Sequence, residues 1–180
     1  GGQSEELKLA RAAAQWCLAQ NADSYDEVGV ALEYGKKTLA ALLVGNPLSE
    51  KAMLNVRAAV ADYALRGGEV KDALNRYSAL LPAFEKVFGI HHQRTMSVRH
   101  GRACAMAGVG ELEECVAELN SLLEDQSAVL GGGHPDSWVT RSKLVELLNC
   151  LGRVEESLAL CNDGDGVSGS DSVAHNLLPA

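Results

Sequence analysis

The sequence predicts an all-α protein, namely an α-solenoid of about four stacked helical hairpins. Alanine and leucine supply 51 of the 180 residues, there is a single isoleucine, and only 4% of residues are aromatic, a composition that favours helix over strand. A pattern of glycine, charged, aliphatic, charged, acidic and small residues occurs three times with a spacing of 42, beginning at Gly68, Gly110 and Gly152. A period of this length is typical of stacked helical pairs.

A second set of residues repeats with the same spacing. The matching residues are His92 with His134, Gly89 with Gly131, and the series Arg57, Arg99 and Arg141. We expect the histidines to lie at turns between repeats, where a side chain can bond a helix terminus. We expect the arginines to form a ladder of contacts with acidic groups of adjacent helices, and binding of a phosphate or carboxylate is the alternative.

The first hairpin is expected at residues 4–44, with helices at 4–21 and 25–44. Its match to the repeat is weaker, because Tyr25-Asp26-Glu27-Val28 follows the pattern without a preceding glycine. Gly45-Asn46-Pro47 has the chemistry of a turn and ends this pair.

The remaining hairpins are expected at 50–88, 94–130 and 136–161. The helices of these pairs should span 50–66 and 69–88, 94–107 and 111–130, and 136–150 and 153–162. Each turn glycine can take the positive φ that closes a helix, and the acidic residues after it suit the first turn of the next helix. The small residue of each unit, which is Ala73, Cys115 or Ser157, should let the two helices approach closely.

Local signals also mark the helix starts and one interruption. Thr95, and either Asp136 or Ser137, are reasonable N-caps for the first helix of a unit, and Pro135 suits a helix entry. Pro82 falls inside the expected helix 69–88, where it removes one backbone donor. We therefore expect it to kink or split that helix.

Residues 162–180 form a tail rich in Gly, Ser and Asp, which we expect to be a flexible spacer that ends the last helix early. A calcium loop is disfavoured, because the positions that should hold its ligands and glycine are Val167, Ser168 and Ala174. A short helix over 172–178 would cap the apolar end of the stack. The alternative is an array that continues beyond this chain.

The last repeat resembles a known family. Gly131-Gly132-Gly133-His134-Pro135-Asp136-Ser137, followed by Leu144, Leu147-Leu148 and then Gly152-Arg153-Val154-Glu155-Glu156-Ser157-Leu158, is similar to the 42-residue tetratricopeptide repeat (TPR) of the kinesin light chain type. The third repeat carries the pattern in degraded form, and the second keeps Arg57 and the segment 68–73. The resemblance covers about residues 48–161 and implies a right-handed superhelix whose first helices line a concave groove for a peptide or a partner helix.

The resemblance also implies which residues face the groove, when positions are counted back from each turn glycine. The groove candidates are Asn55, Asp62, Arg66, His100, Cys104, Ser142, Glu146 and Asn149. Kinesin light chains use a basic, asparagine-rich groove for acidic cargo peptides. The present set has mixed charge, so a preference for acidic ligands is not predicted.

Net charge limits the classes of partner. The chain carries a formal charge of −8, which is unfavourable for nucleic-acid phosphates. Most of that charge lies after residue 90, where the acidic residues include Glu111, Glu113, Glu114, Glu118, Glu124 and Asp125. We interpret this run as a solvated face, and docking of a basic partner is the alternative. The longest apolar stretch, residues 39–44, is too short to cross a membrane.

Residues that could carry chemistry are sparse. His100 and Cys104 are four residues apart and could meet on one helical face, but no orienting third group or oxyanion site accompanies them. We therefore predict no catalytic residues, no metal site and no cofactor. The five scattered cysteines form no CxxC pair, which indicates reduced structural thiols and an intracellular, cytoplasmic location.

The sequence thus favours a non-enzymatic scaffold or adaptor that binds a protein partner through its groove. One alternative is a structural role in which the array mediates self-association. Another is an accessory domain of a larger protein whose catalytic part lies outside this chain.

Overall fold

The structure is a computed structural model that describes residues 28–30, 32, 33, 35–37 and 50–164. Over residues 50–164 the helices are α3 (Glu50–Arg66), α4 (Val70–Phe88), α5 (Gln93–Val109), α6 (Leu112–Val129), α7 (Pro135–Cys150) and α8 (Val154–Gly164). The described part of the chain contains no strand, and its helices begin and end within a few residues of the expected positions. The all-α prediction is confirmed.

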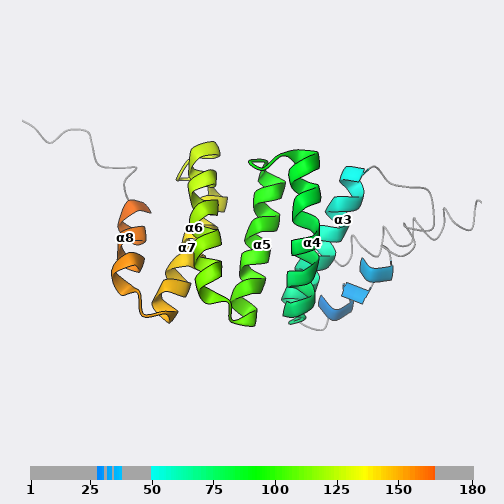
Figure 1. The fold of residues 1–180 in the computed structure, drawn as a ribbon, viewed down its shortest axis with the longest axis horizontal. Helices are drawn as coiled ribbons and strands as arrows, with labels where there is room; N and C mark the ends of the chain where they lie inside the picture. Colours follow the sequence, from blue (N-terminus) through cyan, green and yellow to red (C-terminus); the bar gives the residue numbers. More distant parts are fainter. Residues whose placement is uncertain (1–27, 31, 34, 38–49, 165–180) are drawn as a thin grey trace, which may run out of the picture.

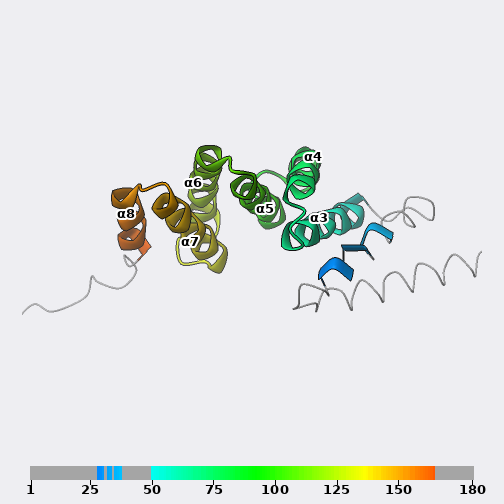
Figure 2. The ribbon, with the colours of Figure 1, turned by 90° about the horizontal axis from the view of Figure 1, so that it is seen from below.

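The helices stack in chain order. Each of α3 to α7 packs against the helix that follows it, and α3 also contacts α5, the first helix of the next pair. Figures 1 and 2 show the resulting row of helices, from α3 at one end to α8 at the other. Contacts limited to neighbours in the row are the defining property of a solenoid.

The three turn glycines close the helical pairs in the same way. Gly68, Gly110 and Gly152 have φ of 81°, 93° and 73°, in the left-handed region that a side chain disfavours. At the middle turn the N–H of Glu111 donates to the carbonyl of Met106 at 3.0 Å, and equivalent bonds close the other two turns. The predicted role of these glycines is confirmed.

The helices α5 and α7 begin at histidines. His92 Nδ1 accepts a hydrogen bond from the N–H of Arg94, and His134 Nδ1 accepts one from the N–H of Asp136, each at 3.1 Å. The histidines therefore bond helix termini as expected, and Pro135 occupies the first turn of α7.

The caps predicted at Thr95 and at Asp136 or Ser137 are wrong. Thr95 and Ser137 are fully buried inside their helices and direct their hydroxyls to backbone carbonyls of Phe84 and Gly131. His92 and His134 already accept from an N–H group in the first turn of each helix. The hydroxyls of Thr95 and Ser137 can therefore bond the segment that precedes the helix.

Pro82 does not split its helix, since α4 runs without interruption from Val70 to Phe88. Pro82 and Ser78, whose carbonyl loses its donor, are both exposed. Water can therefore bond that carbonyl, which lowers the cost of a proline inside a helix.

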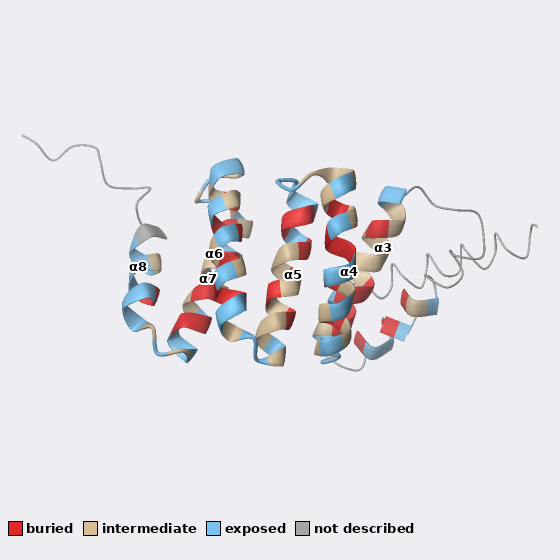
Figure 3. Ribbon diagram, in the orientation of Figure 1, coloured by how far each residue is buried: buried red, intermediate tan, exposed pale blue. Residues whose placement is uncertain are grey.

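Buried side chains form two contiguous clusters that share α5. One is centred on α3 and α4 and reaches Val28 and Leu32, and the other is centred on α6 and α7. In Figure 3 the buried segments line the contacts between neighbouring helices. The predicted small residues sit at those contacts: Ala73, Cys115 and Ser157 are at most 3% exposed, and Cys115 Sγ lies 3.0 Å from the carbonyl of Ala103 on α5.

The two ends of the array are described only in part. Within the expected helix 25–44 the described residues are helical, and Lys36 pairs with Glu69 at 3.1 Å. The expected helix 4–21 and the tail beyond Gly164 lie outside the described residues. The last described helix, α8, has 11 residues whereas α6 has 18. Among the described helices, none is both long and apolar enough to cross a membrane.

Candidate partner-binding groove

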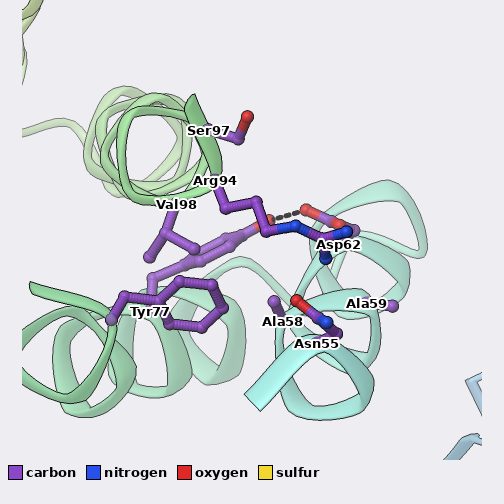
Figure 4. A pocket seen from close by; sticks show the side chains of 9 residues that line it. Asn55, Ala58, Ala59, Asp62, Tyr77, Arg94, Ser97 and Val98 are labelled. Atoms are coloured by element: carbon purple, nitrogen blue, oxygen red, sulfur yellow. Dashed lines mark hydrogen bonds between the residues drawn. The ribbon is translucent and has the colours of Figure 1, made fainter. Parts of the chain in front are cut away.

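A first pocket of about 280 Å³ opens between α3, α4 and α5. Its lining combines polar side chains at the rim with apolar ones beneath, and consists of Asn55, Ala58, Ala59, Asp62, Tyr77, Phe84, Arg94, Ser97 and Val98. Figure 4 shows these side chains converging from the three helices. The pocket lies where the first helices of two consecutive pairs meet, and two groove candidates, Asn55 and Asp62, belong to it.

The floor of this pocket is fixed by a hydrogen bond between helices. The Tyr77 hydroxyl on α4 donates to the Asp62 carboxylate on α3, as the dashed line in Figure 4 shows. The Asp62 residue is exposed at the rim, but its carboxyl is desolvated, and this raises the pKa of Asp62. The hydrogen bond from Tyr77 and the positive charge of Arg66 lower that pKa in part. Desolvation and the neighbouring Asp62 raise the pKa of Tyr77, so this phenol stays protonated and donates.

Gly101 on α5 makes room for the Tyr77 ring. A Cβ at Gly101 would lie 2.5–2.7 Å from the far end of that ring, closer than Cβ atoms approach other heavy atoms in proteins. Tyr77 is 1% exposed and its hydroxyl is bonded to Asp62, so moving the ring away from Gly101 would break that bond. Neither Gly101 nor Tyr77 could be predicted from the repeat, because neither recurs with the period of 42.

A second, smaller pocket of about 120 Å³ lies between α5, α6 and α7. Every residue that lines it stands 42 positions after a residue of the first pocket. The pairs are Asn55 and Ser97, Ala58 and His100, Phe84 and Gln126, Arg94 and Asp136, Ser97 and Val139, and Val98 and Thr140. The structure therefore repeats one pocket in consecutive units of the solenoid, with Ser97 shared between them. Applying the period to Asn55 would have located Ser97 and Val139 from the sequence.

The two pockets differ in the chemistry of their floors. The aromatic Phe84 of the first pocket is replaced by Gln126, and the aliphatic Val98 is replaced by Thr140. Gln126 is 3% exposed and Thr140 is 0% exposed, and neither Gln126 Oε1 nor Thr140 Oγ1 has a hydrogen-bond partner. Polar groups that are buried in this way are unusual in proteins, and these two belong to residues that line the second pocket.

His100 and Cys104 lie on one face of α5, as predicted, with Cys104 Sγ 3.8 and 3.9 Å from the two ring nitrogens. Desolvation lowers the pKa of His100, an effect to which the nearby Lys143 contributes. Desolvation also raises the pKa of Cys104. A nucleophilic pair requires the opposite arrangement, in which a thiolate is stabilised by an imidazolium. The geometry therefore favours a neutral thiol and a neutral imidazole.

The remaining groove candidates lie near the C-terminal halves of the first helices. Arg66 is in the last turn of α3, Ser142 and Asn149 are exposed on α7, and Glu146 pairs with Lys143 at 2.8 Å. None of these four residues lines either of the two pockets. The structure thus brings Asn55 together with Asp62, and His100 together with Cys104, but places the other candidates elsewhere on the same helices.

The expected arginine ladder exists at only one of its three positions. Arg99 contacts Glu118 at 3.1 Å and Asp125 at 2.5 Å, both on α6. Among the described residues, no carboxylate pairs with Arg57 or Arg141, and Arg141 instead lies 5.2 Å from the centre of the Trp138 ring. The reason is that Glu118 and Asp125 do not recur with the period: their equivalents are Arg76 and Ala83 in one direction and Leu160 and Val167 in the other.

The acidic run of α6 is only partly a solvated face. Glu118 and Asp125 bind Arg99, and Glu113 pairs at 2.8 Å with Arg153, the residue just before α8, whereas Glu111, Glu114 and Glu124 are exposed. Half of the run therefore joins neighbouring helices. Among the described residues, no three His, Cys, Asp or Glu side chains are grouped so that they could hold a metal ion.

Comparison with known proteins identifies similar folds. Neither a protein-family profile nor a curated protein matches the sequence. Among solved structures, a protein from Podosopora anserina described as a kinesin light chain with nearly identical TPR-like repeats is 21% identical, with a TM-score of 0.74 over 87% of this chain and 74% of that chain. A single-substitution variant of the same protein is 20% identical, with a TM-score of 0.69 over 86% and 73%.

A third structure, BtubC (BKLC) from P. vanneervenii, is 10% identical and has a TM-score of 0.51 over 98% of both chains. At these identities the comparisons establish the fold. They confirm the resemblance drawn from the repeat motifs at that level: the chain is a TPR-like helical solenoid similar to kinesin light chain repeat structures.

Proposed function

We propose that this chain is a non-enzymatic interaction module that binds a peptide or helix of a protein partner along the groove formed by α3, α5 and α7. The observation that carries this proposal is the pair of pockets related by a shift of 42 residues. A ligand lying across the first helices would meet the same pocket geometry in consecutive repeats, as repeat proteins present an extended binding surface. The eight groove candidates remain proposed contact residues.

The charge of the groove suits a partner that carries basic residues. Asp62 lines the first pocket and Asp136 lines the second, and Arg94 supplies a positive charge in the first. The acidic balance of the chain as a whole supports a protein partner in preference to a nucleic acid. A cytoplasmic location is in keeping with Cys104, Cys115, Cys150 and Cys161, which are free thiols.

Groove binding can be tested at Ser97, the residue common to both pockets. Ser97 is exposed on α5, so Ser97→Trp should fill the groove and change the free energy of unfolding by only about 0.5 kcal/mol. A library of random dodecapeptides would be selected against the wild-type chain and the selected peptides measured by calorimetry. We expect Ser97→Trp to weaken their binding by about tenfold or more, because residue 97 lines both pockets and a bulky side chain there would obstruct the groove between them.

The matched control is Ser78→Trp, which adds the same side chain at an exposed position of α4 that lines neither pocket. It should leave peptide affinity unchanged. Equal affinity of the selected peptides for wild type and Ser97→Trp would show that the groove is not the binding surface. An Asp62→Lys variant would be a poor test of the groove, because it would leave the buried Tyr77 hydroxyl without its acceptor and so lower stability.

A second candidate function, self-association, is favoured by the outer face of α8. Leu158 is 58% exposed and Val154 is 53% exposed, whereas Val116, the equivalent of Leu158 in α6, is 3% exposed under α7. This apolar face is therefore available to a second copy of the array.

For this second candidate we expect sedimentation velocity to show a concentration-dependent dimer that Leu158→Lys abolishes. The same substitution should barely alter the melting transition, because Leu158 is exposed. A chain that stays monomeric at high concentration would exclude self-association through this face. A chain that only binds a partner in its groove is expected to stay monomeric when that partner is absent.

A further inference from the structure

The second pocket, between α5, α6 and α7, has an unusual set of hydrogen-bonding groups. Gln126 Oε1 and Thr140 Oγ1 are buried at its floor and have no partner. Both side chains replace apolar residues of the first pocket, namely Phe84 and Val98, at the equivalent positions of the preceding repeat. The same backbone geometry therefore tolerates an apolar floor, and the polar one is not required to build the fold.

Asp136 and Ser97 also offer acceptors, whereas Val139 is apolar and the neutral His100 ring has one donor and one acceptor nitrogen. Asp136 contributes a carboxylate that receives a hydrogen bond from Gln93 Nε2 at 2.9 Å and retains further acceptor capacity. The Ser97 hydroxyl donates its proton to the carbonyl of Gln93 at 3.0 Å, which leaves its lone pairs free. Asp136 therefore has no proton to donate, and Ser97 has already donated its own. Lys143, on α7, is paired with Glu146.

The first pocket offers the opposite charge at the matching place. Arg94 stands where Asp136 stands in the second pocket, so a cation entering the first pocket would face a guanidinium, and the Asp62 carboxylate there already accepts from Tyr77. A cation entering the second pocket would instead meet a carboxylate and uncharged acceptors. Electrostatic attraction and unsatisfied acceptors therefore coincide in only one of the two pockets.

We propose that the second pocket binds the ammonium group of a lysine side chain from the partner segment that lies in the groove. An ammonium is a compact group with three donors and no acceptor, which matches the acceptors of Gln126, Thr140 and Asp136. The pocket has a volume of about 120 Å³, which is enough to hold this compact group. The proposal rests on the proposed groove function and specifies the chemistry that one part of the groove recognises.

The test uses the double variant Gln126→Leu/Thr140→Val, which gives the second pocket an apolar floor like that of the first. Removing two unsatisfied buried polar groups should leave the melting temperature unchanged or raise it. Random dodecapeptides would be selected in parallel against wild type and the double variant. We expect lysine to be enriched at one position in the wild-type selection and to lose that enrichment in the variant.

Calorimetry then compares a selected lysine peptide with the same peptide carrying norleucine. The lysine peptide should bind wild type about tenfold or more tightly than the double variant, and the norleucine peptide should bind both equally. Asp136→Asn, which keeps the size and shape of the side chain and removes its charge, should weaken only the lysine peptide. Peptides that depend on Ser97 but show no lysine preference would overturn the ammonium pocket and leave groove binding intact. A selection that yields no Ser97-dependent peptide would overturn both.

Discussion

Gly101→Ala is expected to lower the free energy of unfolding by about 2–3 kcal/mol, even though alanine is the better helix former. The added Cβ would lie 2.5–2.7 Å from the Tyr77 ring. Overpacking of a filled core costs about 1–3 kcal/mol, and a displaced Tyr77 would lose its bond to Asp62, which costs about 1–2 kcal/mol more. The gain in helix propensity offsets about 1 kcal/mol of this. Urea denaturation measures the net effect.

A double-mutant cycle separates steric conflict from any general effect at this position. In a Tyr77→Ala background the ring is absent, and Gly101→Ala should then be neutral or stabilising. Gly29→Ala serves as a second control, because a Cβ there meets no atom within 4 Å and the residue is helical. If Gly101→Ala cost the same in both backgrounds, the close approach of Tyr77 would not be the reason for the glycine.

Periodicity explains which features the sequence could reveal. The turn glycines, the capping histidines and the small residues at helix contacts recur every 42 positions, because each repeat must solve the same packing problem. The fold, the helix order and the turn geometry followed from these residues. The role of a recurring residue could also be predicted: His92 and His134 each accept a hydrogen bond from a backbone N–H at the start of a helix.

Features confined to one repeat were not predictable in the same way. Asp62, Tyr77 and Gly101 form one contact, but their equivalents 42 residues later are Cys104, Leu119 and Lys143. No pattern in a single sequence connects such residues, since their proximity depends on how three helices cross. The pockets were predictable only in part, because their positions recur with the repeat while the side chains that line them change from one repeat to the next.

Arg99→Ala is the second substitution expected to have a large effect, with a loss of about 2 kcal/mol in the free energy of unfolding. Arg99 is 13% exposed and its partners Glu118 and Asp125 are 18% and 29% exposed. Desolvation lowers the pKa of Arg99, but the hydrogen bonds to Asp125 and Glu118 more than compensate and raise it overall. Loss of one partner of a fully buried pair costs about 3–5 kcal/mol, and an exposed pair is worth about 0–1 kcal/mol, so this half-buried network falls between them.

The repeat provides a matched control in Arg141→Ala, which removes the same side chain at the same position of the next first helix. Arg141 Nε and Nη1 have no hydrogen-bond partner, and its contact with the Trp138 ring is worth about 1 kcal/mol at most. We therefore expect Arg141→Ala to change stability by less than about 1 kcal/mol. Equal losses for the two variants would mean that the packing of the arginine stem, and not its carboxylate partners, carries the stability. A larger loss at Arg99 would instead show that the recurring arginine stabilises the fold only where its carboxylate partners are also present, since Glu118 and Asp125 occur in one repeat alone.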